Sequence, residues 1–293
     1  MRKILITGSQ GFLGSYIVRS FPERFEVIQA YRKRILAGAQ GSLVQMDIER
    51  PDRVQSVFAE HRPDTVIHLA GIKDLPVCEK EPERTLRLNV EGTVNITAAC
   101  LDHDAFLIFM STDYVFRGDR GSYSQTDLRV PTTVYGRSKR DAEDLIIESG
   151  VPCSICRSGG VYANRHRQST LLSWAGDTLE KGAKIDAFSN IYNSPTCILD
   201  LTRSLRHLAE SRQSGTFHVA GTRMSRWEFL SAFAEARGHA REQIRPQPYE
   251  PPAEDRKLSR PFDLSLDTRD TRRQLGFDFL SVAEGFNALQ PDL

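Results

Sequence analysis

The stretch Lys3-Ile-Leu-Ile-Thr7, followed at once by Gly8-Ser-Gln-Gly11-Phe-Leu-Gly14, decides the fold of this chain. The first five residues predict a short buried strand, and a segment of helical period begins at Phe12. Glycines between them permit a tight turn, a close approach of the backbone to a ligand and tight packing of the helix on the sheet. Because the helix N-terminus favours negative charge, the stretch predicts a site for a dinucleotide diphosphate. The candidate cofactor contacts are Gly8, Gln10, Gly11, Phe12, Leu13 and Gly14.

Outward from this stretch, short apolar runs alternate with segments of helical period through the first 160 residues. The runs predict strands at Lys3–Thr7, Phe25–Tyr31, Ser42–Asp47, Thr65–Ala70, Ala105–Ser111 and Cys153–Ser158. The segments between them predict helices at Phe12–Phe21, Pro51–His61, Glu83–His103 and Thr132–Ser149. Several strands are apolar on both faces, which is typical of a parallel sheet covered by helices on both sides. The predicted fold is α/β, a doubly wound parallel sheet of the Rossmann type with its ligand at the carboxyl ends of the strands.

After about residue 160 the alternation loosens. The pattern there predicts helices at Ser169–Lys181, Leu199–Ser211 and Met224–Arg237, and a strand at Gly215–Ala220 as a candidate extension of the main sheet. Five prolines within residues 245–261 predict an ordered loop rather than regular structure. We therefore expect a dinucleotide-binding domain over residues 1–160 and a smaller C-terminal substrate-binding lobe over residues 161–293, partly interleaved with the first.

The composition excludes several classes of function. The 293 residues contain 39 Lys+Arg and 38 Asp+Glu, a formal net charge of +1, so no overall field attracts nucleic acid or an anionic membrane. No apolar run is long enough to cross a bilayer, and we expect a cytoplasmic protein. The seven histidines show no close ligand pairing, so no metal site is predicted.

The five cysteines, an odd number without dense spacing, do not predict a disulfide framework. Cys153 and Cys156 have the spacing of a redox motif, but they lie in an expected strand, where residues three apart point to opposite faces. Buried thiols are the preferred interpretation, and a redox or metal site is the alternative.

The end of the second strand predicts which dinucleotide is bound. An NAD site usually carries Asp or Glu here, about 20 residues past the glycines, whereas this chain has Arg32-Lys33-Arg34. Cationic groups neutralise a 2′-phosphate, so Arg32 and Lys33 favour NADP over NAD; a solvated basic turn is the alternative. At the end of the third strand, Asp47 is a candidate acceptor for the adenine amino group and Ile48 a candidate packing surface, although Asp47 could equally cap the next helix.

Three residues predict the catalytic chemistry. Tyr135 and Lys139 lie one helical turn apart, so both can project from one face of a helix. A nearby ammonium favours phenolate, so we expect a lowered pKa for Tyr135 and a role as acid or base. Thr112 follows the apolar strand Phe106–Met110, where a doubly wound sheet places catalytic groups, and its hydroxyl is placed to bind a substrate carbonyl.

The sequence around Thr112, Tyr135 and Lys139 resembles the dTDP-4-dehydrorhamnose reductase family of extended short-chain dehydrogenases/reductases. The resemblance rests on Met110-Ser-Thr-Asp-Tyr-Val-Phe116 and Tyr135-Gly-Arg-Ser-Lys-Arg-Asp-Ala-Glu143, and it continues in order through His68-Leu-Ala-Gly71, Asn89-Val-Glu-Gly-Thr93, Arg157-Ser-Gly-Gly-Val-Tyr162 and Arg260-Pro-Phe-Asp-Leu-Ser-Leu-Asp267. It implies NADPH-dependent reduction of a nucleotide-linked 4-keto-6-deoxy sugar, with Thr112, Tyr135 and Lys139 as catalytic residues. By the same resemblance, Tyr135, Lys139, Leu69, Ala70, Gly71 and Asn89 contact the cofactor.

The expected substrate contacts are Lys73, Asp113, Tyr114, Val115 and Tyr162. The chain departs from the family at Gly160, where a bulky residue is usual, and in the loop 72–79, which is more similar to dehydratases and epimerases of amino sugars. A solvated loop is the alternative for Lys73 and its neighbour Asp74. The Arg165-His166-Arg167 cluster is a candidate for the sugar nucleotide diphosphate, with surface solvation as the alternative.

Two rival functions stay open, and a homodimer is possible. One is an epimerase or dehydratase that retains its NAD; elimination needs an acid and a base after Thr112, and here Asp113 is followed by Tyr114, a poor base. The other is a non-catalytic, NADP-binding regulatory subunit like the methionine adenosyltransferase β subunit, which resembles this family. The complete set of Thr112, Tyr135 and Lys139 favours the reductase.

Overall fold

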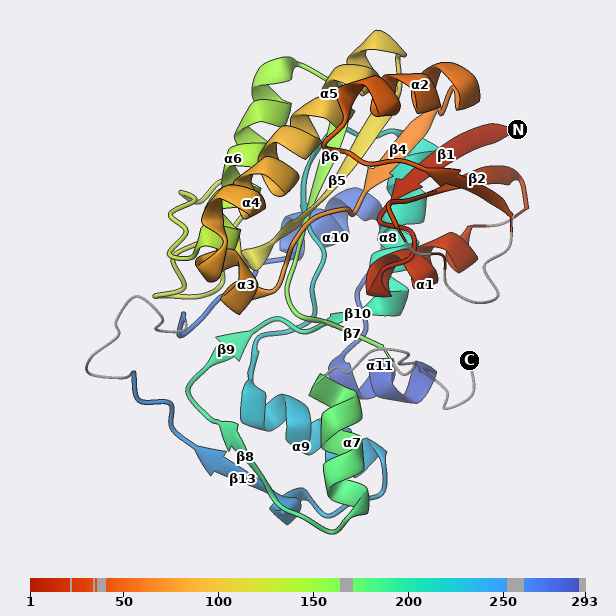
Figure 1. The fold of residues 1–293 in the computed structure, drawn as a ribbon. Helices are drawn as coiled ribbons and strands as arrows, with labels where there is room; N and C mark the ends of the chain where they lie inside the picture. Colours follow the sequence, from red (N-terminus) through yellow and green to blue (C-terminus); the bar gives the residue numbers. More distant parts are fainter. Residues whose placement is uncertain (22, 34, 36–40, 164–170, 252–260, 290–293) are drawn as a thin grey trace. The chain divides into compact units, whose positions relative to one another are not determined.

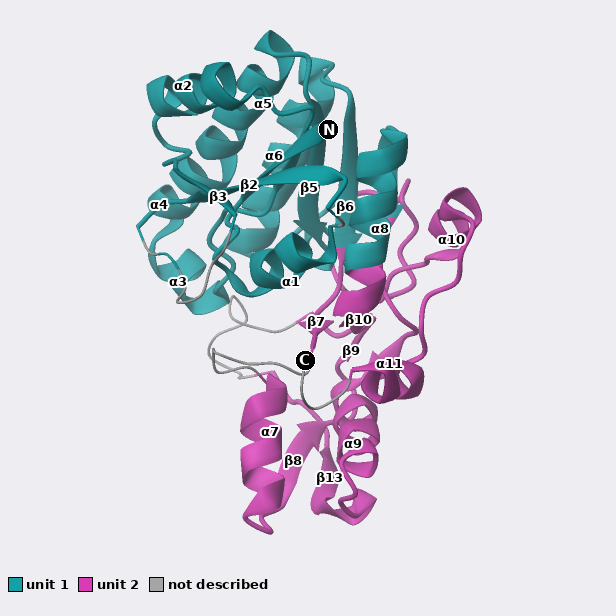
Figure 2. Ribbon diagram, turned by 90° about the vertical axis from the view of Figure 1, so that its right-hand side faces the viewer, with its two compact units in different colours: residues 1–115, 129–157, 202–217 teal, residues 116–128, 158–201, 218–293 magenta. Residues whose placement is uncertain are grey.

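The computed structural model describes residues 1–21, 23–33, 35, 41–163, 171–251 and 261–289. The chain divides into two compact units, which Figure 2 colours separately. Unit 1 comprises residues 1–115, 129–157 and 202–217, and unit 2 comprises residues 116–128, 158–201 and 218–293. Two segments therefore fall on the other side of the boundary expected at residue 160: the loop 116–128 belongs to unit 2, and the segment 202–217 belongs to unit 1.

Unit 1 is built on a seven-stranded sheet with the strand order β11-β6-β5-β4-β1-β2-β3 (Figure 1). Its strands are β1 (Arg2–Thr7), β2 (Phe25–Tyr31), β3 (Ser42–Gln45), β4 (Thr65–His68), β5 (Phe106–Thr112), β6 (Cys153–Ser158) and β11 (Gly215–His218). Strand β1 pairs in parallel with β2 and β4, β2 with β3, and β4 with β5. The predicted doubly wound fold is confirmed, and β11 extends the sheet as expected. Because the strand order reverses between β1 and β4, a crevice opens at the carboxyl ends of these two strands.

Helices cover both faces of this sheet (Figures 1 and 2). On one face lie α2 (Pro51–His61), α5 (Gly92–Asp102) and α6 (Val134–Ser149), and on the other lie α1 (Phe12–Ser20) and α8 (Ile198–Ser211). The first face forms a fully buried core in which side chains of α2, α5 and α6 pack against alternate strand residues such as Leu5, Leu107 and Phe109. The neighbours Ile4 and Ile6 are also buried, as a two-sided sheet requires.

The helix expected over Glu83–His103 is interrupted. The structure has α4 (Pro82–Leu86), a π-helical turn over Arg87–Glu91, and then α5. A π-helical turn inserts an extra residue into the helix and changes the direction of its side chains, and such turns are frequent at functional sites. The segment 72–79, expected as a loop, contains the short helix α3 (Leu75–Lys80), whose N-terminus Asp74 caps by accepting from the backbone N of Val77.

Unit 2 contains three small two-stranded sheets and four α-helices among its described residues. The sheets pair β7 (Val161–Tyr162) with β10 (Thr196–Cys197), β9 (Tyr192–Asn193) with β12 (Met224–Ser225), and β8 (Ile185–Phe188) with β13 (Ile244–Gln247). The helices are α7 (Leu171–Glu180), α9 (Arg226–Ala236), α10 (Arg269–Leu275) and α11 (Val282–Ala288). The prediction of irregular structure from residue 245 onward is wrong at its start, because β13 contains Pro246. Both strands of a two-stranded sheet are edge strands, and edge strands tolerate proline.

Candidate active site

The glycine turn after β1 has the geometry that the sequence predicts. Gly8 adopts a left-handed conformation with φ 66°, and its carbonyl oxygen accepts a hydrogen bond of 3.0 Å from the backbone N of Gly11. A Cβ atom on Gly14 would lie 2.4 Å from the Gly8 carbonyl oxygen, so only glycine lets α1 start this close to the strand. The N-terminus of α1 consequently faces the crevice above β1 and β4.

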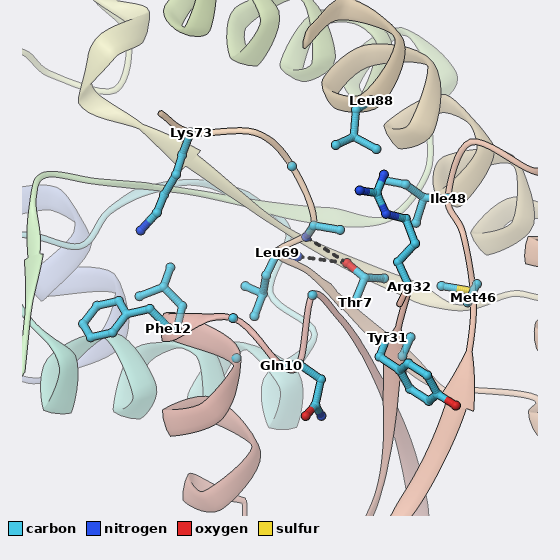
Figure 3. Close-up of a pocket in the computed structure, with 17 residues that line it drawn as sticks. Thr7, Gln10, Phe12, Tyr31, Arg32, Met46, Ile48, Leu69, Lys73 and Leu88 are labelled. Atoms are coloured by element: carbon cyan, nitrogen blue, oxygen red, sulfur yellow. Dashed lines mark hydrogen bonds between the residues drawn. The ribbon is translucent and has the colours of Figure 1, made fainter. Parts of the chain in front are cut away.

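A pocket of about 320 Å³ occupies this crevice (Figure 3). The predicted residues that line it are Gly8, Gln10, Gly11, Phe12, Leu13, Gly14, Arg32, Ile48, Leu69, Ala70, Gly71 and Lys73. Five further residues line the pocket and were not predicted from the sequence: Thr7, Ala30, Tyr31, Met46 and Leu88. Four of the five lie beside predicted residues at strand ends, so the strand pattern could have identified them; Leu88 lies in the π-helical turn, which the sequence did not indicate.

Five residues predicted to contact a cofactor do not line the pocket: Lys33, Asp47, Asn89, Tyr135 and Lys139. Lys33 is exposed. Asp47 accepts a hydrogen bond of 3.1 Å through Oδ1 from the backbone N of Glu49, in the turn before α2, whose N-cap is Arg50. Asn89 is buried, and its amide bonds both the N (2.7 Å) and the O (2.9 Å) of Ile72 and the hydroxyl of Ser138 (3.0 Å). Asn89 thereby ties the π-helical turn to the loop after β4 and to α6.

A chain of buried hydrogen bonds joins the ends of β1 and β4 beneath the pocket. The Thr7 hydroxyl accepts from the backbone N of Leu69 and of Ala70, each at 3.1 Å (Figure 3), so its own hydrogen goes to His68 Nδ1 at 2.7 Å. Thr93 donates to the Asn89 carbonyl at 2.7 Å and therefore accepts from His68 Nε2 at 3.1 Å. Burial and, secondarily, the Lys139 charge lower the pKa of His68 to about 3, so the imidazole is neutral.

The end of β5 holds Thr112 and Asp113, both buried. The Thr112 hydroxyl donates to Asp113 Oδ1 at 3.0 Å and accepts from the backbone N of Tyr114 at 3.3 Å. Burial raises the pKa of Asp113 to about 7, although the Thr112 hydroxyl and backbone N–H groups favour the carboxylate. Tyr135, in the first turn of α6, lies near enough for the Thr112 hydroxyl to influence its pKa.

The prediction that the pKa of Tyr135 is lowered is wrong. Burial raises the pKa of its phenol above the usual value, and the nearby Thr112 hydroxyl opposes this shift only in part. The expectation considered the ammonium of Lys139, but the loss of water around the phenolate has the larger effect. The edge of the Tyr114 ring packs against Tyr135 with the ring centroids 5.9 Å apart. Tyr135 therefore keeps its proton at neutral pH.

Lys139 is buried one turn further along α6, with Nζ 3.8 Å from the centroid of the Phe109 ring. Burial lowers the pKa of Lys139 to about 7, and the carboxylate of Glu143 opposes this in part. The Phe109 ring in turn packs with its centroid 5.8 Å from that of His68 at the end of β4, so the ammonium lies near this strand end.

Glu143 supports the site, although the sequence indicated no role for it. Its carboxylate is fully buried and accepts from Arg157 through Nε (3.0 Å) and Nη2 (2.7 Å), from Arg129 Nη1 (3.0 Å) and from the Ser111 hydroxyl. Burial alone would raise the pKa of Glu143, but these partners hold it below its usual value. The cluster connects α6 to β5 and β6, and it fixes the helix that carries Tyr135 and Lys139.

The residues predicted to contact substrate are not equivalent in the structure. Lys73 lines the pocket and lies with Nζ 5.5 Å from the centroid of the Phe12 ring, toward which Figure 3 shows it pointing. Val115 is fully buried, so its side chain offers no surface to a ligand. In unit 2, Tyr162 is buried and packs against Phe229 (5.3 Å between centroids) and Phe286 (5.1 Å), and the substrate role expected for it stays a prediction. Arg34 and the Arg165–Arg167 cluster lie outside the described residues.

The remaining predictions concern the cysteines and metal binding. Cys153 and Cys156 are both free thiols on β6, and burial raises the pKa of Cys156 to about 12. The part of the chain that the structure describes contains no group of three or more His, Cys, Asp or Glu side chains that could hold a metal ion. It also contains no helix long and apolar enough to span a membrane.

A parallel sheet that opens with a glycine turn, together with Thr112 at the end of β5 and Tyr135 and Lys139 one turn apart on α6, defines an extended short-chain dehydrogenase/reductase, a class of NAD(P)-dependent oxidoreductases. Within this class, the chain belongs to the family described as the RmlD substrate binding domain, whose model matches residues 1–289.

Three known proteins illustrate the range of its relatives. Methionine adenosyltransferase 2 subunit beta of Rattus norvegicus is 27% identical over 256 residues, which cover 84% of this chain and 75% of that protein. The probable low-salt glycan biosynthesis reductase Agl14 of Haloferax volcanii is 31% identical over 219 residues, 73% of each chain. A crystal structure of dTDP-4-dehydrorhamnose reductase from Bacillus anthracis in complex with NADP has a TM-score of 0.86 at 25% identity and covers 99% of both chains.

Proposed function

We propose that this protein reduces the keto group of a nucleotide-linked 4-keto-6-deoxy sugar with NADPH. The observation that carries the proposal is that Thr112, hydrogen-bonded to Asp113, and the buried Tyr135 lie in the same unit as the dinucleotide pocket, with Lys139 one turn further along α6. The relatives named as reductases, and the NADP complex of the Bacillus anthracis enzyme, support the same reaction and cofactor.

The residues around the pocket suit a dinucleotide phosphate. Gly8 and Gly14 bring the N-terminus of α1 against the crevice, where backbone N–H groups and the helix dipole favour a diphosphate. Arg32 lines the opposite end of the pocket and supplies a guanidinium for a 2′-phosphate. Ile48 and Leu88 offer apolar surface between them for an adenine ring.

Hydride transfer is the chemistry that a bound reduced nicotinamide supplies to the keto carbon. Tyr135 then donates its phenolic proton to the carbonyl oxygen, which takes up the electron pair of the C=O bond. The Thr112 hydroxyl directs its own hydrogen to Asp113, so we assign Thr112 the role of orienting the Asp113 carboxyl beside the Tyr135 phenol. The ammonium of Lys139 stabilises the phenolate left on Tyr135 and is placed to hold the nicotinamide ribose.

Product analysis on a panel of 4-keto-6-deoxy sugar nucleotides with NADPH tests this function. The expected result is one NADPH oxidised per sugar, followed by absorbance of the reduced nicotinamide, with a product heavier by two hydrogens in mass spectrometry. A product lighter by one water from the parent 4-hydroxy sugar, formed without net oxidation of NADPH, would instead identify a dehydratase. An unchanged mass with altered stereochemistry would identify an epimerase.

A non-catalytic regulatory subunit is the second candidate function. The identity of 27% with a methionine adenosyltransferase β subunit over 84% of the chain favours it. The test is co-purification with a methionine adenosyltransferase catalytic subunit, measured with and without NADP. Stable association together with no turnover on any sugar nucleotide of the panel would replace the reductase with this function.

A further inference from the structure

Three charged side chains from different elements meet at the adenosine end of the pocket. Arg32 follows β2, Glu49 lies between β3 and α2, and Arg87 begins the π-helical turn. Glu49 Oε2 lies 3.5 Å from Arg32 Nη1, and Glu49 Oε1 lies 4.0 Å from Arg87 Nε. A single carboxylate is thus shared between two guanidinium groups, which its two oxygens face separately.

The backbone of Glu49 is held while its side chain remains accessible. The Glu49 backbone N donates to Asp47 Oδ1 at 3.1 Å, and the carbonyl of Ile48 accepts from Asn95 at 2.8 Å. The side chains of Arg32, Glu49 and Arg87 are 38%, 33% and 53% exposed, so each can exchange partners at little cost. The carboxylate is therefore fixed in position but can give up either arginine.

Only Arg32 of these three side chains lines the pocket, where it extends toward Ile48 (Figure 3). A 2′-phosphate arriving there carries more charge than a carboxylate and competes with Glu49 for the Arg32 guanidinium. A cofactor with a 2′-hydroxyl does not compete for the Arg32 guanidinium. Its neutral hydroxyl can donate to the Glu49 carboxylate while Arg32 stays paired with the same carboxylate. Arg87 offers Glu49 a second partner after Arg32 leaves.

We propose that Glu49 and Arg87 set the preference between NADPH and NADH by controlling how readily Arg32 is released to a 2′-phosphate. Glu49 lowers the affinity for NADPH by competing for Arg32, and Arg87 restores it by neutralising Glu49. The inference rests on the proposed function only in taking a nicotinamide dinucleotide as the ligand. Glu49 and Arg87 act through Arg32 and are positioning residues.

The variants Glu49→Gln and Arg87→Gln test this competition through dissociation constants for NADPH and NADH, measured by fluorescence of the reduced nicotinamide at low salt. Glu49→Gln should lower the Kd for NADPH about three- to fivefold, the scale of an exposed ion pair, and leave NADH within about twofold. Arg87→Gln should raise the Kd for NADPH by a similar factor, because Glu49 then holds Arg32 alone.

The double variant Glu49→Gln/Arg87→Gln shows whether Arg87 acts through Glu49. If it does, adding Arg87→Gln to Glu49→Gln has no further effect on the Kd for NADPH. A further loss in the double variant would mean that Arg87 contacts the phosphate directly, and it would overturn the proposed route. Arg212→Gln is the matched control, because Arg212 is 40% exposed and pairs with Asp64, at the opposite end of the sheet from the pocket, at 3.6 Å.

Two failures are distinguishable in this experiment. If wild type binds neither dinucleotide, the proposed function fails. If wild type binds NADPH but Glu49→Gln changes the two dissociation constants equally, the function stands and the competition for Arg32 is wrong. Loss of the NADPH effects at high ionic strength is a further expected result, since exposed charges are screened by salt.

Discussion

The two ends of the proposed dinucleotide site hold their charges in opposite ways. At the end near β5 and α6, Glu143 and Lys139 are buried, and burial shifts the pKa values of Lys139 and of Asp113 toward 7. At the adenosine end, Arg32 and Glu49 are each about a third exposed and meet at 3.5 Å. Buried charges are costly to leave unpaired, whereas exposed pairs contribute little and are screened. We therefore expect the catalytic end to respond to pH and the adenosine end to respond to salt.

The largest effect expected at the catalytic end follows from Tyr135→Phe. Removal of the phenolic proton donor should reduce kcat by about 10²- to 10⁴-fold, the usual contribution of a general acid. The Kd for NADPH should stay nearly unchanged, because the substitution removes one oxygen and little packing surface. Steady-state kinetics together with fluorescence titration measure both quantities. Retention of more than about a tenth of kcat would remove the phenol from the mechanism.

Glu143→Gln tests the buried charge network that fixes α6. The substitution leaves the guanidinium of Arg157 buried without its counter-charge, so the free energy of unfolding should fall by about 3–5 kcal/mol. Denaturant unfolding measures the change. Asp144→Asn is the matched control: Asp144 also pairs with Arg129 but is 40% exposed, and its loss should cost about 1 kcal/mol or less. Equal costs for the two variants would contradict the distinction between buried and exposed pairs.

The pH dependence of cofactor binding tests Lys139. Because its pKa in the folded protein is about 7, the ammonium is lost as pH rises through 7, and the Kd for NADPH should rise over the same range. The free energy of unfolding responds in the opposite sense and rises as pH rises. The unfolded chain recovers the usual pKa of 10.5, so the contribution of Lys139 to stability is complete above about 10.5 and is lost as pH falls to about 7. In Lys139→Met, the Kd for NADPH should be weaker and flat between pH 6 and about 8. A wild-type Kd that is equally flat would contradict the assignment.

The smallest effect is expected for Arg32→Gln at the adenosine end. The Kd for NADPH should rise about three- to tenfold at low salt and less at high salt, with NADH nearly unchanged, because the lost contact is charged but exposed. Lys33→Gln provides the comparison, since Lys33 is exposed and does not line the pocket. If Lys33→Gln weakens NADPH more than Arg32→Gln does, the 2′-phosphate lies elsewhere on the basic turn.

Sequence pattern predicted those parts of the site that depend on local periodicity. Gly8 and Gly14 could be assigned because strand, turn and helix follow one another within a few residues, and Tyr135 and Lys139 because one helical turn separates them. Strand ends such as Thr112 follow from the same alternation. These features need no knowledge of contacts between distant segments.

The features that could not be predicted depend on contacts distant in the sequence. Glu143 becomes a buried anion only because β5, β6 and residue 129 bring Ser111, Arg157 and Arg129 to it. The pKa of Tyr135 was predicted in the wrong direction because charge spacing is visible in a sequence and burial is not. The buried position of Tyr162 likewise depends on α9 and α11, which lie far along the chain.

The hydrogen-bond chain through His68 has a direction, and this makes the floor of the pocket sensitive to acid. A proton added to the imidazole would turn Nδ1 from acceptor into donor, and Thr7 would then face three hydrogens with a single hydroxyl oxygen. Either the Leu69 or the Ala70 N–H would lose its acceptor, and both residues line the pocket. As pH falls from about 6.5 toward 3, we expect the protection of these two amides against hydrogen exchange, relative to the intrinsic rate at each pH, to fall before the sheet as a whole unfolds. Acid would thus loosen the wall of the cofactor pocket while the fold that carries it is still intact.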